Sequence, residues 1–527
     1  MKTTTMDAGE AVIQNALDRQ AHANDVINKW NSPIQQFYKG STVFVTGGSG
    51  FLGKQLIEKL FRSCRIGKVF ILLRPKKEKS VEERLAAILK DALYDTLRKD
   101  QPNFADRIVT VVGDIADKDM GISETDRQMI IKEVTVIFHA AATINFQSPL
   151  RAATFVNVRG TRDLISLAKQ CEKLRSFVYI STAYSHATFS RRSQEVLEQF
   201  YPCSIDPHTM IQLAETLEEE RIDSITQGLI KDWPNTYTFT KALAEEMVRS
   251  SAEELPICVI RPTIVICARR EPYTGWVDKS SIIGPNGLIL GCMAGVIHAL
   301  HTSFDVKIDF IPVDYVTNAA IVAAATNQVS KIFTVGTSCR NHITWGGLSD
   351  ILNNDVRKNI CSPKAVWYCF ALQSSNKWVF SIYNFVVHTI PANLVDGICV
   401  MLKKPPRLKK IHSMIAKMSS VLSFYTNNDW IFNDSNTVEL FNSLSESDKI
   451  IYHCNIADIE WKEQIALWCV GLRKCIMKDG LRDTAWAQRK QLFFKMTTYF
   501  FIVFFIYVFG LAFIRTCVYF LEIILDF

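Results

Sequence analysis

The sequence predicts an α/β protein with a doubly wound parallel sheet, followed by a smaller, mainly helical C-terminal domain and a final apolar helix. Three observations support this prediction. β-branched strands alternate with helix-forming segments up to about residue 338, a glycine-rich turn joins the first strand to the first helix, and an uncharged apolar stretch lies near the C-terminus. At 527 residues the chain is too long for one ordinary core, so we expect more than one domain.

The glycine-rich turn follows a β-branched and aromatic run that ends at Thr46, and its three glycines have the spacing G-x-x-G-x-x-G. Such a turn needs a residue that tolerates positive φ, and a pyrophosphate needs backbone without a Cβ in its way. The helix that follows offers free N–H groups to the phosphates. This Rossmann-type pattern predicts a dinucleotide site formed by Thr46, Gly47, Gly50, Phe51, Leu52 and Gly53. A glycine turn without a ligand is the weaker alternative.

The second predicted strand, Lys68 to Leu73, ends at Arg74, with Lys77 close behind. At this position an acidic residue would bind the ribose 2′-hydroxyl of NAD. A carboxylate repels a 2′-phosphate, whereas a guanidinium binds it with two hydrogen bonds. We therefore expect NADPH as the cofactor, held by Arg74 and Lys77. A solvated basic loop is the alternative.

The next two predicted strands also end in residues suited to a cofactor. The strand from 107 to 114 ends in Asp114, followed by Ile115, and we expect Asp114 to meet the adenine amino group. The strand from 135 to 139 continues into the small residues Ala140, Ala141 and Ala142, which let the backbone lie against the cofactor. Asn157 is expected to brace the loops near the site, or else to cap a helix.

Candidate catalytic groups follow the fifth strand, which spans 177 to 180. Ser181 and Thr182 stand at its carboxyl end, where side chains point into the substrate crevice. Tyr237 and Lys241 are four residues apart on a predicted helix and so share one face. We expect the lysine ammonium to lower the pKa of the phenol and to hold the nicotinamide ribose. The sequence therefore predicts catalysis by Tyr237 and Lys241 with a hydroxyl of Thr182 or Ser181.

Together these elements resemble the extended short-chain dehydrogenase/reductase superfamily, and further motifs resemble its fatty acyl-CoA reductase family. The resemblance covers nearly everything from 37 to 480 and is carried by segments 46–54, 139–142, 181–184, 259–265, 271–278, 284–287, 309–314 and 341–346. It implies that Tyr237 is the proton donor, Lys241 its electrostatic partner, and Thr182, in preference to Ser181, the group that polarises the carbonyl. It also implies cofactor contacts at Pro262, Thr263 and Ile264.

The implied reaction reduces a long-chain fatty acyl-CoA with two NADPH, through an aldehyde, to a primary fatty alcohol and free CoA. Each reduction places negative charge on one oxygen, where a hydroxyl and a phenol are needed. Two other functions stay open at this point. One is a different extended-type oxidoreductase or epimerase acting on a sterol or a sugar nucleotide. The other is a catalytically idle lipid-binding scaffold.

The domain division follows from the change in pattern along the chain. We expect a lead-in over 1–36, an NADPH-binding reductase domain over 37–338, a helical domain over 339–480, and a basic linker with an anchor over 481–527. Within the helical domain, 378–402 is strongly apolar but interrupted by Pro391, Asn393 and Asp396. A membrane-facing hairpin and a buried helix pair are equally compatible with it. The lead-in contains acidic residues and no apolar core of a secretory signal. We expect it to be loosely ordered, with a short amphipathic helix over Ala11 to Trp30 as the alternative.

Residues 496–514 carry no charge and are long enough to cross a bilayer, so they predict a transmembrane helix. Basic residues before it favour a catalytic domain that faces the cytosol, on the endoplasmic reticulum or on peroxisomes. The net charge of +7 is scattered, so no nucleic-acid partner is expected. The fourteen cysteines lack a C-x-x-C pair, and no metal site is expected. A homo-oligomer is possible.

Overall fold

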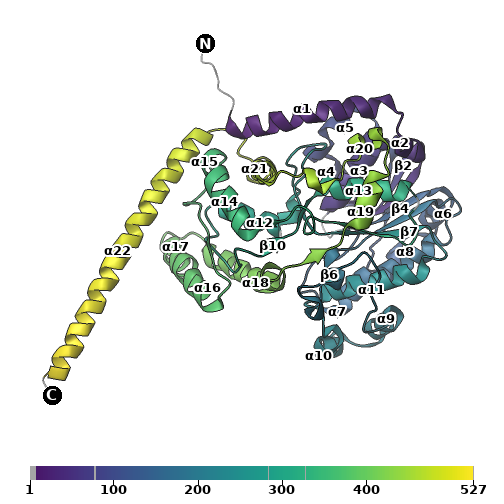
Figure 1. Ribbon diagram of the computed structural model, residues 1–527. Coiled ribbons are helices and arrows are strands. Elements are labelled where there is room, and N and C mark those ends of the chain that lie inside the picture. The colour runs from purple at the N-terminus through teal and green to yellow at the C-terminus, as the bar shows by residue number, and fades with distance from the viewer. Residues whose placement is uncertain (1–6, 76–78, 283, 327, 526–527) are drawn as a thin grey trace, which may run out of the picture.

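The computed structural model describes residues 7–75, 79–282, 284–326 and 328–525 (Figure 1). Its centre is a seven-stranded parallel sheet with the strand order β12-β7-β5-β4-β1-β2-β3. The strands are β1 (Thr42–Thr46), β2 (Lys68–Leu73), β3 (Ile108–Val112), β4 (Val136–His139), β5 (Ser176–Ile180), β7 (Ile257–Pro262) and β12 (Ile332–Val335). The strand order reverses direction at β1, so the predicted doubly wound architecture is confirmed.

The register of the sheet brings the predicted site segments to one edge. Thr46 at the end of β1 pairs with His139 at the end of β4, and His139 pairs with Tyr179 of β5. Ile180 in turn pairs with Ile260 of β7. Because all these strands run in parallel, the loops after β1, β4, β5 and β7 emerge side by side. Ligands of open α/β sheets bind at this edge.

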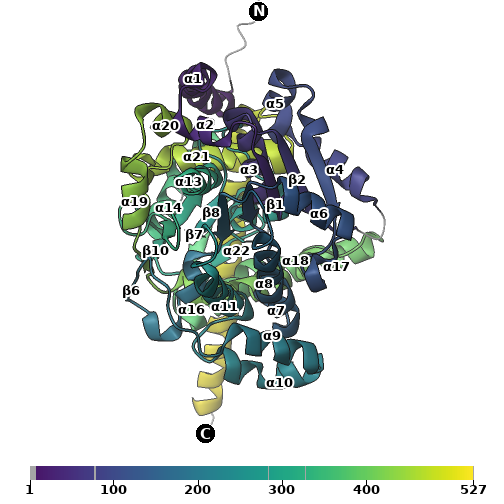
Figure 2. The same ribbon diagram turned by 90° about the vertical axis from the view of Figure 1, so that its right-hand side faces the viewer.

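Helices cover both faces of the sheet and form two apolar cores (Figures 1 and 2). One core holds residues of α3 (Phe51–Cys64) and α13 (Val313–Ala325) together with one set of strand side chains. The other holds residues of α6 (Glu124–Glu133), α8 (Gly160–Ala168) and α11 (Thr236–Ser251) with the opposite set. Strands covered on both faces must be apolar throughout, which explains runs such as Val43 to Val45.

The N-terminal segment is helical, so the expectation of a loosely ordered lead-in is wrong. Helix α1 (Ala8–Lys29) starts at Asp7, whose carboxylate accepts from the Gly9 N–H at 2.9 Å, and α2 (Pro33–Tyr38) follows. Val26 and Ile27 are buried in the same core as β1. The helix packs on α20 (Glu446–Ile451) and α21 (Trp461–Gly471). Its order therefore depends on partners more than 400 residues away, which its own weakly apolar sequence does not reveal.

The C-terminal part is mainly helical and is joined to the sheet domain at several points. Strand β15 (Ile431–Phe432) pairs with β6 (Glu195–Val196), and Leu440, Leu444 and Ile451 enter the core of α3 and α13. Its other elements are α14 (Trp345–Ile351), α15 (Arg357–Asn359), α16 (Lys377–Asn384), a π-helical turn (Phe385–Thr389), α17 (Ile390–Met401), α18 (Leu408–Thr426) and α19 (Ser435–Asn442). The short strands β9 (Ala299–Leu300) and β14 (Leu372–Gln373) and helix α12 (Pro285–Met293) lie beside them.

Helix α22 (Thr484–Leu525) extends away from the body of the protein (Figure 1). Two helical segments in the described residues are long and apolar enough to cross a membrane: Lys377–Met401, with mean hydropathy 1.2, and Thr484–Tyr519, with mean hydropathy 2.3. The second contains the predicted span 496–514. A helix exposed and apolar on all sides is stable in lipid rather than in water.

Candidate active site

The glycine turn has the close packing that its sequence predicts. Gly47 has a φ of +75°, and a Cβ built on it would lie 2.6 Å from the Ala140 carbonyl carbon. A Cβ on Gly53 would lie 2.3 Å from the Gly47 carbonyl oxygen. No other residue fits these two positions without moving backbone. The turn therefore lies directly against Ala140 at the end of β4, and the first turn of α3 lies directly on the glycine turn.

The start of α3 offers donors to an anion. Its N-cap residue is Gly50, which has no side chain to cap the helix. Among the described residues, no group accepts a hydrogen bond from the backbone N–H of Phe51, Leu52 or Gly53. Uncapped N–H groups at a helix N-terminus bind phosphate oxygens. The residues present therefore fit the pyrophosphate of a dinucleotide.

Arg74 and Asp114 meet at the ends of β2 and β3. The guanidinium of Arg74 lies 3.2 Å from the Asp114 carboxylate, and the Arg74 side chain is 60% exposed. Arg84 of α4 (Val81–Leu89) donates to the Arg74 carbonyl, which brings a second guanidinium to the same place. Sequence reasoning missed Arg84 because it lies on a helix one turn beyond the basic loop. Lys77 falls outside the described residues.

A buried chain of hydrogen bonds stabilises the loops after β1 and β4. His139 Nδ1 lies 2.7 Å from the Thr46 hydroxyl, and its Nε2 lies 2.9 Å from the Thr161 hydroxyl. Thr161 donates to the Asn157 carbonyl at 2.7 Å, so the proton of His139 is on Nε2 and Thr46 donates to Nδ1. Burial, with Lys241 nearby, lowers the pKa of His139 to about 3, so the imidazole is neutral. Thr46 is thus buried and braces the turn.

Asn157 links the loop after β4 to the helix that carries Tyr237. Its amide oxygen accepts from the Thr143 N–H at 2.9 Å, and its amide nitrogen donates to the Thr240 hydroxyl at 2.9 Å. It lies inside a π-helical turn, Phe155–Arg159, rather than at a helix start. The structure therefore gives Asn157 bracing contacts and no capping contact. Ala141 and Ala142, half-buried, lead into this braced loop.

Tyr237 lies on the first turn of α11, with Thr182 near enough to favour its phenolate form. Burial of the phenol raises the pKa of Tyr237 to about 12, and the Thr182 contact offsets only part of this. Lys241 is buried and donates to the Ile180 carbonyl at 2.7 Å. Burial lowers the pKa of Lys241 to about 7, although Glu245 opposes the shift. The expected lowering of the phenol pKa is therefore absent from this geometry, because burial disfavours the charged form of both groups.

The two neighbouring hydroxyls after β5 have different partners. Thr182 contacts Tyr237, whereas Ser181 donates to the carboxylate of Glu245 on the inner side of α11. Ser181 is thereby turned away from the phenol. The structure brings Thr182, Tyr237 and Lys241 together and places Ser181 in a separate, buried network.

That network is centred on an ion pair which the sequence did not reveal. Arg261 at the end of β7 binds the Glu245 carboxylate with two hydrogen bonds, of 3.0 and 2.6 Å, and both side chains are buried. Ser185 and His186 also contact the carboxylate. Burial opposes the negative charge, but Arg261 outweighs it and holds the pKa of Glu245 well below its usual range. Glu245 lies one helical turn after Lys241, so its charge stabilises the ammonium.

An aromatic wall lies against Tyr237 and includes a residue of the C-terminal part. The Phe146 ring stacks on the Tyr237 ring with centroids 5.4 Å apart, and Phe146 also contacts Tyr425 at 5.7 Å. Tyr425 is at the end of α18 and meets Tyr184 edge-on at 5.1 Å. We call Phe146, Tyr184 and Tyr425 the aromatic wall. No sequence motif marks Tyr425; its role comes from the folding of α18 onto the sheet domain.

The remaining predicted cofactor residues occupy the same edge of the sheet. Pro262 ends β7, and the buried Thr263 follows it, with its N–H bonded to the Val335 carbonyl at 3.1 Å. Ile264 is half-buried and packs beside Tyr184 and Tyr425. Ile115 is buried in the loop after Asp114. Among the described residues, no group of three or more His, Cys, Asp or Glu side chains is placed to hold a metal ion.

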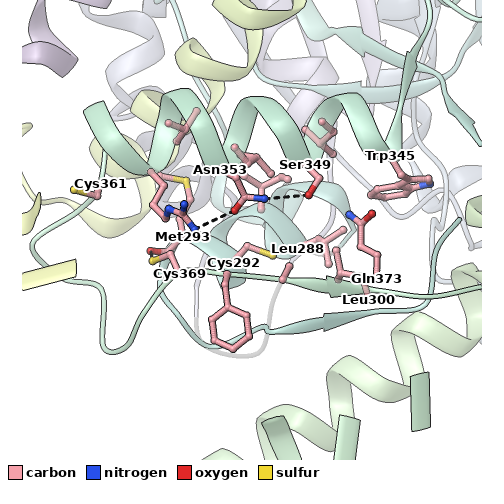
Figure 3. A pocket seen from close by; sticks show the side chains of 17 residues that line it. Leu288, Cys292, Met293, Leu300, Trp345, Ser349, Asn353, Cys361, Cys369 and Gln373 are labelled. Carbon is pink, nitrogen blue, oxygen red and sulfur yellow. Dashed lines mark hydrogen bonds between the residues drawn. The ribbon is translucent and has the colours of Figure 1, made fainter. Parts of the chain in front are cut away.

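A separate small apolar cavity of about 60 Å³ lies in the C-terminal part, between α12, α14–α15 and strands β9 and β14 (Figure 3). Leu288, Cys292, Met293, Leu300 and Leu348 are among the side chains that line it. Leu300 lies at one end of the cavity, and the carbonyl of the next residue, His301, accepts a hydrogen bond of 3.1 Å from the Asn427 side-chain amide. Asn427 is two residues from Tyr425, so this end of the cavity adjoins the segment that carries the aromatic wall.

Comparisons with known proteins agree with this geometry. Two family models described as "Male sterility protein" match residues 45–320 and 387–479, and the first is of an NAD-binding type. The chain is 34% identical over 456 residues to "Fatty acyl-CoA reductase wat" of Drosophila melanogaster, covering 86% of this chain and 87% of the relative. It is 33% identical to "Fatty acyl-CoA reductase 1" of Rattus norvegicus, covering 87% and 89%.

Solved structures share the fold. The terminal R domain of a myxalamid PKS-NRPS pathway aligns with a TM-score of 0.56 at 18% identity, covering 83% of this chain and 92% of that one. The reductase domain of a non-ribosomal peptide synthetase from Mycobacterium tuberculosis aligns with a TM-score of 0.54 at 19% identity, covering 87% and 99%.

Proposed function

The chain belongs to the fatty acyl-CoA reductase family, and we propose that it reduces a long-chain acyl-CoA to a primary fatty alcohol at a membrane surface. The observation that carries this proposal is the position of Tyr237 one helical turn before the buried Lys241, near Thr182 and beside the aromatic wall. It supplies two hydroxyl donors for one substrate oxygen next to apolar surface. The protein is a reductase with a nicotinamide-binding domain.

Tyr237 and Thr182 act on the carbonyl oxygen of the substrate. When bound, a reduced nicotinamide would supply hydride twice: once to the thioester, whose C–S bond then breaks to release CoA and leave the aldehyde, and once to the aldehyde, so two equivalents are consumed. Negative charge grows on the carbonyl oxygen, and the two hydroxyls stabilise it. Tyr237, which stays protonated at neutral pH, then gives its proton to this oxygen as the oxygen gains negative charge and becomes the stronger base. Lys241, in its ammonium form, stabilises the phenolate that results.

NADPH fits the basic residues at the end of β2 better than NADH. Arg74 is exposed at the place where an acid would bind an unphosphorylated ribose, and Arg84 adjoins it through a hydrogen bond to the Arg74 carbonyl. Asp114, paired to Arg74, orients that guanidinium, and we propose that it also meets the adenine amino group. Guanidinium groups bind phosphate with strong, charge-assisted hydrogen bonds.

A long alkyl chain fits the apolar surfaces that adjoin Tyr237. The aromatic wall covers the first part of the chain, and we propose that its distal part extends toward the apolar side chains around the cavity of Figure 3. The relatives are named fatty acyl-CoA reductases, which agrees with this substrate class.

Helix α22 supports a membrane location. Its uncharged part, residues 496–514 within the longer apolar stretch, has about the length of a bilayer core of ~30 Å, since 20 helical residues rise ~30 Å. Lys490 and Lys495 precede the segment, so we propose that the catalytic domain lies on the cytosolic side. The endoplasmic reticulum and the peroxisome are the two candidate membranes.

The test is product analysis with the full chain in lipid nanodiscs, NADPH and acyl-CoA thioesters of several lengths. We expect fatty alcohol and free CoA with two NADPH consumed per alcohol, and a Tyr237→Phe variant that binds NADPH but turns over roughly 10²–10⁴-fold more slowly. Tyr273→Phe, which changes a phenol away from the site, is the control. Turnover of a sterol or sugar nucleotide without alcohol formation would assign a different extended-type oxidoreductase. No turnover with any of these compounds would indicate a catalytically idle lipid-binding scaffold.

A further inference from the structure

Helices α16 and α17, joined by the π-helical turn, expose one continuous apolar face. Trp378 is 83% exposed and Met401 77%, at the two ends of the segment. Between them lie further exposed side chains at helical spacing: Ile382, Phe385, Val386, Leu394, Val395 and Ile398. An apolar surface of this kind is not stable in water and marks a contact with lipid or protein. We call this surface, with the start of α18, the hairpin face.

The opposite side of the π-helical turn and of α17 is held by the protein. His388, Ala392 and Asp396, spaced four residues apart, are buried in a single stripe. His388 accepts from the His298 N–H at 2.8 Å, and its ring packs on His412 of α18 at 4.5 Å. A helix attached to its domain along one stripe cannot leave it to cross a bilayer. The segment Lys377–Met401 therefore lies on the surface despite its length and hydropathy.

Asp396, a buried residue within α17, closes the hairpin between α17 and α18. Asp396 accepts from the N–H groups of Arg407, Leu408 and Lys409 at 2.9–3.1 Å and thereby caps the start of α18. Its pKa is lowered, first by the Lys409 N–H and then by the other two donors, so it stays ionised at neutral pH. The chain between α17 and α18 is thus a fixed reverse turn. Exposed basic residues gather there: Lys403, Lys404, Arg407, Lys409 and Lys410.

Charge distinguishes a lipid surface from a protein partner. Residues 377–426 contain seven lysines and arginines and a single acid, Asp396, which is engaged in the cap. Apolar side chains flanked by lysine and arginine are typical of helices that lie in the interface of an anionic leaflet. Each basic residue near such a surface adds to the electrostatic attraction. A second copy of this chain would instead bring like charges together.

The hairpin and the foot of α22 are attached to the same short segment, Trp367 to Phe370. Trp367 stacks on Phe494 of α22 at 5.4 Å, and the Cys369 N–H donates to Gln491 at 2.9 Å. On its other side, the Tyr368 carbonyl accepts from His298, the residue that binds the hairpin through His388. The two apolar elements therefore keep a fixed relation, and Figure 1 shows α16 and α17 on the side of the body that faces α22.

We propose that the hairpin face is a second membrane contact, which lies in the plane of the anionic leaflet from which α22 enters the bilayer. Trp378, Phe385 and Ile398 insert at the level of the headgroups and the first carbons of the acyl chains. The lysines of the reverse turn bind lipid phosphates. This inference rests on the proposed membrane anchoring by α22 but not on the reaction catalysed.

The test measures the depth of Trp378 in full-length protein reconstituted into nanodiscs. Brominated lipids quench nearby indoles, and bromines can be placed near the headgroup or near the chain end. The emission of Trp378 is the difference between the wild type and Trp378→Phe. The control is the emission of Trp461, obtained in the same way from the wild type and Trp461→Phe. The Trp461 indole donates to Asn341 inside the domain. We expect strong quenching of Trp378 by shallow bromines, weaker quenching by deep ones, and none of Trp461.

Stronger quenching of Trp378 by bromines near the chain end than by bromines near the headgroup would show a spanning helix and overturn the proposal. A Trp378 that is not quenched in nanodisc-bound protein would also overturn it. A chain that does not co-migrate with nanodiscs would overturn the anchoring by α22 and this inference together. The double variant Lys403→Glu/Lys404→Glu should reduce the quenching of Trp378 in nanodiscs with anionic lipid but not in zwitterionic ones. Equal quenching of this variant and the wild type in anionic lipid would overturn the role of the lysines.

Discussion

Asn235 donates a hydrogen bond of 2.7 Å to the hydroxyl of Tyr425, which lies 190 residues further along the chain. Asn235 is the N-cap of α11, where its side-chain oxygen accepts from the Thr238 N–H. The C-terminal part thus contacts the residue that starts the helix carrying Tyr237 and Lys241. The hydroxyl of Tyr425 positions that cap, and its ring completes the aromatic wall.

We expect Tyr425→Ala to lower kcat/KM for acyl-CoA by roughly tenfold or more, because the loss of an aromatic ring contact and of buried apolar area costs ~1.5–3 kcal/mol. The KM for the cofactor should not change. Tyr425→Phe is the matched variant: it keeps the ring, loses the bond from Asn235, and should retain most of the activity. Equal losses in the two variants would contradict a packing role for the ring. Steady-state kinetics with both substrates measures this.

The pH dependence of activity should follow Lys241. Its pKa is about 7 in the folded protein and 10.5 ordinarily, because burial disfavours the ammonium. The ammonium stabilises the developing phenolate, so kcat/KM should fall as pH rises through about 7, while Tyr237, with a pKa of about 12, stays protonated. Lys241→Met should have low activity without this fall. Lys132→Met, which changes an exposed lysine, is the control, and its pH profile of kcat/KM should match that of the wild type.

The same shift has a consequence for stability. Between about pH 7 and 10.5 the unfolded chain binds a proton at Lys241 that the folded protein does not, so stability rises with pH across this window. Below about 7 both states are protonated, and the folded state carries the full cost of the buried charge. Thermal unfolding of the wild type and Lys241→Met at several pH values checks the sign. A wild-type stability that falls relative to the variant across the window would refute it.

Arg74 should decide between the two nicotinamide cofactors. We expect Arg74→Ala to raise the KM for NADPH by roughly 10- to 100-fold, since a hydrogen bond to a charged group contributes ~1.5–3 kcal/mol. The KM for NADH should change little, because NADH has no 2′-phosphate. Arg98→Ala, which removes an arginine paired to Asp95 away from this strand end, is the control. A wild type that prefers NADH would contradict the proposed cofactor.

Glu245 and Glu246 are neighbours on α11 and provide a matched pair for stability. Glu245→Gln leaves the buried Arg261 without its counter-charge and should lower the free energy of unfolding by about 3–5 kcal/mol. Glu246→Gln breaks an exposed pair with Arg249 and should change the free energy by at most about 1 kcal/mol. Denaturant or thermal unfolding of both variants measures the difference. Similar losses in the two would contradict the assigned role of the buried pair.

The cavity in the C-terminal part should set the accepted chain length. Cys292→Trp fills space lined by Leu288, Met293 and Leu300, so we expect lower kcat/KM for long acyl-CoA thioesters and little change for short ones. Cys292→Ala adds no bulk and should retain the wild-type preference. Overpacking costs ~1–3 kcal/mol of stability, so the unfolding temperature is measured alongside. A uniform loss over all chain lengths would place the alkyl chain elsewhere.

The sequence by itself determined the central sheet and the cofactor-binding turn, because both depend on local patterns. Apolar strands that alternate with helix-forming segments specify the sheet. Gly47 and Gly53 mark positions where a Cβ would collide with backbone. Tyr237 and Lys241 could also be chosen from sequence, since four residues on a helix place them on one face. The long apolar run of α22 needs no partner to be recognised.

The tertiary structure decided what depends on contacts between distant segments. Ser181 and Thr182 are adjacent and chemically similar, and only the position of Glu245 separates their partners. The pKa of Tyr237 is raised rather than lowered because burial of the phenol outweighs the effect expected from the Lys241 ammonium one helical turn away. Helix α1, Tyr425 and the hairpin face acquire their roles from packing against residues tens to hundreds of positions away. Burial and long-range packing are properties of the folded chain, and no local pattern encodes them.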